Sequence, residues 1–170
     1  MKENRIICLD FDDCILPSNN NYFGYTDDNM RIAEINLQRI KMICEKYGAK
    51  IFITSSWYTL LKFKSRGKFK NITLNVKSDD YHCIDADTHL FVGLLQKYIG
   101  KYIVSLSEGN RDKDIEKLKQ DPLNKIVVID DMDLSEHSSD KCLFLYTNGL
   151  ITNQMGYFID KFFEPERYQL

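Results

Sequence analysis

The sequence predicts an α/β fold of the doubly wound type, with a mainly parallel central sheet. Three short apolar runs, at residues 6–9, 51–54 and 126–129, contain no polar alternation. This pattern is typical of strands that are buried on both faces of a parallel sheet. Segments with helical spacing of apolar residues separate the runs, as expected for a doubly wound sheet. The length of 170 residues suits one domain, so we treat residues 1–170 as a single unit.

The first strand, residues 6–9, leads through a short loop into a long helix. Asp28 can cap a helix over residues 29–47, and Gly48 provides its end. Five residues are spaced for one buried face of this helix: Ile32, Ile35, Ile40, Ile43 and Tyr47.

The second strand, residues 51–54, is expected to be followed by a helix that begins after Ser56. The run at residues 126–129 is preceded by three further elements: a helix at residues 89–98, a strand at residues 102–106 and a helix at residues 112–120 that stops before Pro122. Trp57 is expected to pack beneath the segment after the second strand, the alternative being an exposed indole that stacks on a base.

The last strand, residues 142–146, is followed by a helix at residues 153–163. Its aromatic residues are expected to close the core: Tyr157, Phe158, Phe162 and Phe163.

The composition is that of a globular protein, with 44% hydrophobic and 28% charged residues. A membrane-spanning helix needs about 20 apolar residues, and neither such a run nor a signal-peptide core is found. Five scattered cysteines without a CxxC pair are typical of reduced thiols, so we expect a cytoplasmic protein with no membrane contact. The net charge of −2 argues against strong non-specific nucleic-acid binding. Nothing indicates an obligate protein partner.

Each of the three apolar runs ends in polar residues that can carry chemistry. These residues are Asp10, Asp12, Ser55, Asp130 and Asp131. Ligands of open parallel sheets bind just beyond the carboxyl ends of the strands, where these side chains would meet. Four carboxylates at one rim repel each other unless a cation binds them, and hard oxygen ligands favour Mg²⁺. The sequence therefore predicts an Mg²⁺ site that can also take a phosphate.

Asp10 and Asp12 are spaced for two roles in phosphoryl transfer. Residues at i and i+2 of a strand end point to the same side, so both carboxylates can address one reacting centre. One carboxylate can attack phosphorus and form an aspartyl-phosphate, while the other moves protons to and from the leaving group. A nearby cation and hydroxyl would stabilise the transferring phosphoryl group.

These motifs resemble those of the haloacid dehalogenase (HAD) phosphatase superfamily. The resemblance lies in Asp10-Phe11-Asp12 after an apolar strand, a strand that ends at Ser55, and Asp130-Asp131 after the last long apolar run. The segments IFITSSW, RDKDIEKL, IVVIDDMD and NGLIT are similar to those of the small HAD domains of the Swiss Army Knife RNA-repair type. The resemblance implies a HAD-like Rossmannoid fold and an Mg²⁺-dependent phosphatase.

Residue by residue, the resemblance implies that Asp10 is the nucleophile and that Asp12 is the general acid and then the general base. Ser55 would hydrogen-bond the phosphoryl group. Asp131, with Asp130 beside it, would hold Mg²⁺. Asp10 and the backbone carbonyl oxygen of Asp12 would complete the protein ligands of the ion.

The resemblance also implies a cation on the helix before the strand at residues 126–129. Arg111 and Lys113 can both fill this place, and Lys113 is preferred. Two positions depart from the family pattern, because Asp13 and Cys14 stand where it usually has glycine and then threonine or valine. Asp13 adds negative charge near the phosphate site, where it can slow turnover or contact substrate, whereas Cys14 is expected only to pack.

The chain has room only for a short flap at residues 14–27 and a small insertion at about residues 66–81, so we expect a rather open site. Open sites in this superfamily often act on macromolecular or end-group phosphates. The resemblance to the RNA-repair type implies nucleic-acid ends or nucleotides as the leading substrate class. Residues 62–70 hold five cations and two aromatics. We take Lys62 and Lys64, together with Ser56, as candidate substrate contacts. The alternative is a solvated helix end.

Other functions remain open at this point. The same rim could belong to a HAD phosphatase of small metabolites, or to a phosphotransferase with an acceptor other than water. It could also belong to a non-catalytic module that holds Mg²⁺ and a phosphorylated partner. Asp13 favours this alternative, because its negative charge near the phosphate site can slow turnover.

Overall fold

The computed structural model describes residues 3–17, 26–66, 69–75 and 86–168. They form an α/β fold around a five-stranded parallel sheet in the order β5-β2-β1-β6-β7. The strands are β1 (Asn4–Leu9), β2 (Lys50–Ile53), β5 (Ile103–Leu106), β6 (Asn124–Asp130) and β7 (Cys142–Tyr146). The Rossmann-like class and all five strands predicted from the sequence are confirmed.

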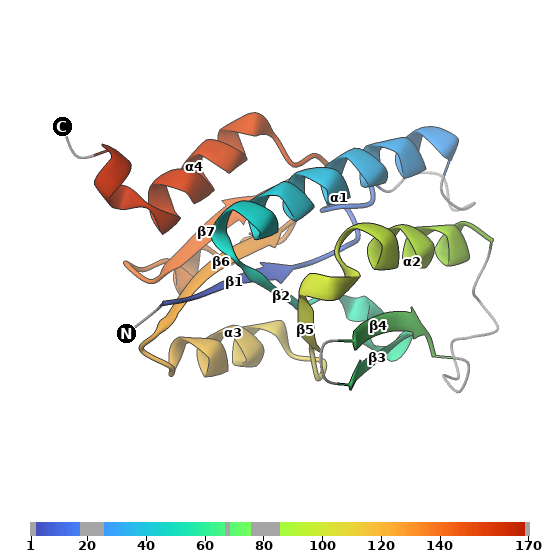
Figure 1. Ribbon diagram of the computed structural model, residues 1–170, viewed down its shortest axis with the longest axis horizontal. Coiled ribbons are helices and arrows are strands. Elements are labelled where there is room, and N and C mark those ends of the chain that lie inside the picture. Colours follow the sequence, from blue (N-terminus) through green and yellow to red (C-terminus); the bar gives the residue numbers. More distant parts are fainter. Residues whose placement is uncertain (1–2, 18–25, 67–68, 76–85, 169–170) are drawn as a thin grey trace.

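Helices cover both faces of the sheet (Figure 1). One face packs on α1 (Asp27–Tyr47), α2 (Ala86–Tyr98) and α4 (Asn153–Phe163), and the other on α3 (Arg111–Lys119) and the short turn η4 (Ser135–His137). Successive strand residues face the two layers in turn, so Ile7 and Leu9 join the larger core while Ile6 and Cys8 join the smaller one. This two-sided burial explains why the runs in the sequence are continuously apolar.

Helix α1 differs from the prediction at its start and on one face. Its cap is Thr26, whose hydroxyl oxygen accepts a hydrogen bond from the amide of Asn29 at 3.3 Å, and not the exposed Asp28. Ile40 and Tyr47 are buried as predicted, but Ile35 is 45% exposed, and Met30, Ala33, Leu37 and Cys44 form the rest of the buried face. These residues recur at steps of three and four, which places Ile35 outside the stripe. Gly48 ends the helix with φ of 64°, as the sequence predicts.

The helix expected after Ser56 is absent from the described structure. One 3-10 turn, η1 (Ser56–Thr59), leads into an antiparallel hairpin of β3 (Leu61–Arg66) and β4 (Phe69–Leu74). Leu61 of β3 and Ile72 of β4 are buried, and the amide of Ile72 donates to Gln96 Oε1 of α2 at 2.9 Å. The insertion therefore begins near residue 61, earlier than expected, while residues 76–85 lie outside the described residues.

Helix α4, near the C-terminal end of the chain, packs on the same face of the sheet as α1. Helix α4 has the predicted bounds, but Tyr157 and Phe158 are 49% and 42% exposed and do not close the core. Its buried stripe is Met155, Ile159 and Phe163, a narrow face that suits a helix over the edge strand β7. The remaining 3-10 turns are η3 (Gly100–Tyr102) and η5 (Pro165–Tyr168). No helix within the described ranges combines the length and the apolarity needed to span a membrane.

Candidate active site at the carboxyl ends of the central strands

The carboxyl ends of β1, β2 and β6 lie at one level of the sheet. Leu9, the last residue of β1, pairs with Ile53 on one side and with Ile129 on the other. The amide of Asp10 donates to the carbonyl oxygen of Ile129 at 3.2 Å. The amide of Thr54 donates to the carbonyl oxygen of Leu9 at 3.0 Å. The hydrogen bonding of β1 with β6 and of β1 with β2 thus continues for one residue beyond the strands. The polar residues that follow the three strands therefore lie side by side.

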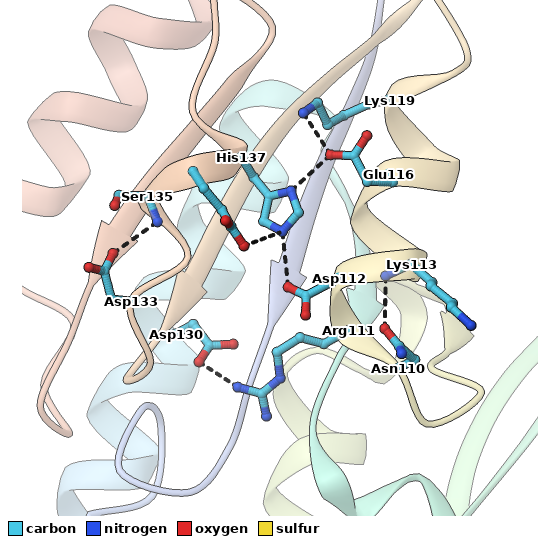
Figure 2. A network of polar contacts seen from close by, with 11 residues as sticks. Asn110, Arg111, Asp112, Lys113, Glu116, Lys119, Asp130, Asp133, Ser135 and His137 are labelled. Carbon is cyan, nitrogen blue, oxygen red and sulfur yellow. Dashed lines mark hydrogen bonds and ion pairs between the residues drawn. The ribbon is translucent and has the colours of Figure 1, made fainter.

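Three carboxylates and one guanidinium meet at this level. Asp10, Asp130 and Asp131 each place one carboxylate oxygen within 4.8 Å of the other two. Asp10 and Asp130 are buried, with 3% and 0% of their surface exposed. Arg111 bridges them, since its Nη1 lies 2.5 Å from Asp130 Oδ1 and its Nη2 lies 3.4 Å from Asp10 Oδ1. The Arg111–Asp130 pair is drawn in Figure 2.

Burial dominates the electrostatics of the two inner carboxylates. It raises the pKa of Asp10 to about 7, against the opposing effect of the Arg111 guanidinium, and the negative charge of Asp130 raises that pKa further. Hydrogen bonds from the amide of Phe11 and the side chain of Ser55 lower the pKa of Asp10 in part. Burial likewise raises the pKa of Asp130. Without a further cation, Asp10 and Asp130 therefore hold their protons more tightly than exposed carboxylates do.

One oxygen of the cluster lacks a partner among the described residues. Asp130 Oδ1 accepts hydrogen bonds from Arg111 and from the amide of Met132 at 2.9 Å. Asp130 Oδ2 is buried and has no hydrogen-bond partner. A buried oxygen in this state is costly unless a ligand satisfies it. The carboxylates of Asp10, Asp130 and Asp131 could therefore hold a metal ion, and an all-oxygen ligand set suits a hard cation.

Asp12 follows at the start of a tight turn. Its Oδ2 accepts a hydrogen bond from Trp57 Nε1 at 2.9 Å. The sequence interpretation treated Trp57 only as packing or as a base-stacking surface. A buried indole N–H normally needs an acceptor, which is the signal that could have pointed to this contact.

The two departures from the family pattern have structural explanations. Asp13 adopts φ of 52°, a left-handed conformation that glycine takes without strain and aspartate tolerates. Its amide donates to the carbonyl oxygen of Leu16 at 3.0 Å, which closes the turn. Cys14 is fully buried, its thiol donates to the carbonyl oxygen of Ile129 at 3.4 Å, and burial raises its pKa well above the usual range. Cys14 therefore packs, as expected. Of the flap at residues 14–27, positions 18–25 lie outside the described residues.

The two serines after β2 differ in exposure. Ser55 is fully buried, its Oγ accepts a hydrogen bond from the amide of Trp57 at 3.3 Å, and its side chain is hydrogen-bonded to Asp10. Ser56 is exposed. Ser55 thus orients Asp10 in this structure, while Ser56 lies at the surface of the same turn.

Arg111, and not Lys113, belongs to the carboxylate cluster. Asn110 caps α3 by accepting the amide of Lys113 at 3.0 Å, and the exposed Lys113 side chain points away from Asp130 (Figure 2). Residues two apart on a helix point about 200° apart around its axis, so only one of the two cations can face the cluster. The preference for Lys113 is not supported by this placement.

Helix α3 is fixed in this orientation by His137 of η4. His137 is 5% exposed, and its ring nitrogens contact Asp112 Oδ1 at 3.0 Å and Glu116 Oε1 at 2.9 Å (Figure 2). Burial lowers the pKa of His137, but these two carboxylates outweigh it and the net shift is upward. The contacts hold the first turn of α3, which carries Arg111, against the sheet.

The basic residues of the hairpin lie near the site in sequence but outside the cluster. Lys62 and Lys64 are exposed on β3, and Phe63 between them packs against the core. This alternation has the period of a strand, so the solvated helix end considered above is wrong. The hairpin directly follows η1, whose Trp57 contacts Asp12.

Comparison of the chain with protein-family models, with curated proteins and with solved structures gave no match. The site's chemistry must therefore be inferred from its own residues.

Removing Arg111 and Lys113 of α3 separately is expected to have unequal effects. Arg111→Met should lower kcat/KM for the phosphate release expected from the sequence by about 10²-fold, because it removes a fixed positive charge next to Asp10. Lys113→Met should stay within about twofold of wild type, since a solvated surface charge contributes little. Steady-state kinetics of the two variants, with circular dichroism as the folding control, check this. Equal losses in both would contradict the assignment of Arg111.

Mg²⁺ affinity is expected to fall as the pH drops below about 7. The pKa of Asp10 is raised from 3.8 to about 7 in the metal-free fold, so this group favours the fold below pH 3.8, and its contribution is lost as the pH rises through 7. A bound cation must displace that proton, and the apparent Kd should weaken about tenfold for each pH unit below 7. Calorimetric titration at pH 5.5, 6.5 and 7.5 measures this. The pH dependence of the apparent Kd should weaken in Asp10→Asn. If the same dependence persists in this variant, the displaced proton belongs to another group.

Proposed function

We propose that this protein is a HAD-type phosphatase that hydrolyses phosphomonoesters with Mg²⁺ through an aspartyl-phosphate on Asp10. The observation that carries the proposal is the cluster of Asp10, Asp130 and Asp131 with Arg111 at the carboxyl ends of parallel strands. Asp12 supplies a second acid–base group two residues from the nucleophile. The sequence resemblance to small HAD domains points to the same chemistry.

Asp10 and Asp12 divide the reaction between them. A carboxylate oxygen of Asp10 attacks phosphorus, the bond from phosphorus to the leaving oxygen breaks, and Asp12 donates its proton to that oxygen. Asp12, now a carboxylate, takes a proton from water as the water oxygen attacks phosphorus. The bond between phosphorus and Asp10 then breaks, which releases phosphate and restores both residues.

The charges around Asp10 support this chemistry. Arg111 lies against the nucleophile and provides a fixed positive charge for the phosphoryl oxygens. Ser55 orients Asp10 by a hydrogen bond. Asp10, Asp130 and Asp131, with the backbone carbonyl of Asp12, would hold Mg²⁺. When bound, the ion supplies positive charge that offsets the repulsion between these carboxylates and the phosphate.

The leading substrate class is a nucleic-acid end or a nucleotide phosphate. Support comes from the β3–β4 hairpin, which follows η1 at the site and exposes Lys62 and Lys64. The exposed Ser56 adds a hydroxyl on the same turn. Cations of this kind can follow a phosphate backbone. Phosphorylated small metabolites are the second class, and the same site without turnover would be a binding module.

The test is phosphate release from an aryl phosphate and from 3′- and 5′-phosphorylated oligonucleotides, with and without Mg²⁺. We expect metal-dependent release, with higher kcat/KM for an oligonucleotide than for the aryl phosphate. Folded protein that binds a phosphorylated oligonucleotide with Mg²⁺ but releases no phosphate would favour the binding module. In that case Asp13→Gly, which suits the left-handed φ and removes the extra charge, is the variant to assay next.

A further inference from the structure

Trp57 connects the candidate acid–base residue to a rigid aromatic cluster. Trp57 is 6% exposed, and its Nε1 donates to Asp12 Oδ2 at 2.9 Å. Its ring packs edge-to-face on Phe11 and on Phe91, with centroids 5.8 Å and 5.2 Å away, and these two rings also meet each other at 5.4 Å. Phe11 and Phe91 are fully buried. Three elements therefore fix the indole: the turn after β1, η1 and α2.

The backbone of Trp57 is held as firmly as its ring. Its amide donates to Ser55 Oγ at 3.3 Å, and its carbonyl oxygen accepts from the amide of Leu60 at 2.9 Å. The Ser55 side chain is in turn hydrogen-bonded to the Asp10 carboxyl group. One short turn thus orients both carboxylates of the Asp10-Phe11-Asp12 motif, Asp10 through the Ser55 hydroxyl and Asp12 through the indole N–H.

We propose that Trp57 is a positioning residue that fixes the carboxyl group of Asp12 for proton transfer to the leaving oxygen. This proposal rests on the proposed phosphatase function. The hydrogen bond from the indole N–H holds Oδ2 in place and favours the Asp12 rotamer that makes this contact. A proton donor that is misplaced by about 1 Å loses much of its effect, so a contact that holds the Asp12 carboxyl group contributes to proton transfer.

Substrates with different leaving groups separate this role from general packing. A nitrophenolate departs without a proton, whereas an alkoxide needs one, so only alkyl phosphates depend on Asp12 in the steps that kcat/KM reports. Trp57→Phe keeps an aromatic ring and removes the N–H. We expect its kcat/KM to fall about tenfold for an alkyl phosphate and to stay within about twofold for 4-nitrophenyl phosphate.

Phe91→Leu is the matched control. It loosens the same aromatic cluster, leaves the indole N–H in place, and should change kcat/KM by the same factor for both substrates. If Trp57→Phe also lowers both values equally, Trp57 only packs and the proposal is overturned. A wild-type protein that releases phosphate from neither substrate would instead contradict the proposed function.

The contact itself can be tested without turnover. Trp57 is the single tryptophan of the chain, so one indole N–H resonance reports on it. Asp12→Ala should move this resonance upfield, while Asp13→Gly should leave it in place. A resonance that does not respond to Asp12→Ala would overturn the proposal even if the protein is an active phosphatase.

Discussion

Asp10→Asn is expected to abolish Mg²⁺-dependent phosphate release, with a loss of at least about 10³-fold in kcat. The amide has nearly the shape of the carboxyl group but cannot attack phosphorus, and it is a poorer ligand for a hard cation. Because burial raises the pKa of Asp10 to about 7, the ionised carboxylate is unfavourable in the metal-free fold. The variant should therefore be no less stable than wild type at pH 8 without Mg²⁺.

Phosphate release and thermal unfolding on the same preparation check both parts of this prediction. An inactive variant with an unchanged or higher Tm would show that Asp10 acts in the chemistry and not in folding. Release that survives the substitution would contradict the aspartyl-phosphate mechanism. A Tm that falls would contradict the electrostatic description of the cluster.

Asn36→Ala is expected to cost about 3 kcal/mol of unfolding free energy, the largest stability effect that we expect. Asn36 of α1 is fully buried, and its side chain makes three hydrogen bonds to backbone groups. Its Nδ2 donates to the carbonyl oxygens of Ile15 at 2.8 Å and of Gly149 at 2.9 Å, and its Oδ1 accepts from the amide of Ile151 at 2.8 Å. Alanine would leave all three groups buried and unpaired, and would release the turn after Asp12 from the loop after β7.

Thermal or urea unfolding measures the loss, which corresponds to a Tm lower by about 6–12 °C for a chain of this size. Ile35→Ala is the control on the neighbouring position, since that side chain is 45% exposed and its loss should cost less than about 0.5 kcal/mol. A Tm for Asn36→Ala within the range of this control would show that water replaces the three bonds.

The fold class and the positions of the five strands could be predicted because a strand buried on both faces needs a continuous apolar run. Two of the wrong predictions of structure, the helix after Ser56 and the core role of Tyr157 and Phe158, have a different origin. Strands β3 and β4 form a hairpin because Ile72 of β4 is buried and its amide bonds to Gln96 of α2, a contact distant in sequence. The exposure of Tyr157 and Phe158 follows from the narrow contact of α4 at the sheet edge.

The sequence by itself determined that carboxylates follow the buried strands, and the carboxyl ends of neighbouring parallel strands meet at one edge of a sheet. Of the four carboxylates expected at this edge, the structure groups Asp10, Asp130 and Asp131 because β1 and β6 are neighbours. Only the tertiary structure decided that Arg111 faces this cluster and that Trp57 holds Asp12. The rotation of a helix about its axis and the stacking of rings from three elements depend on long-range packing, which local sequence does not specify.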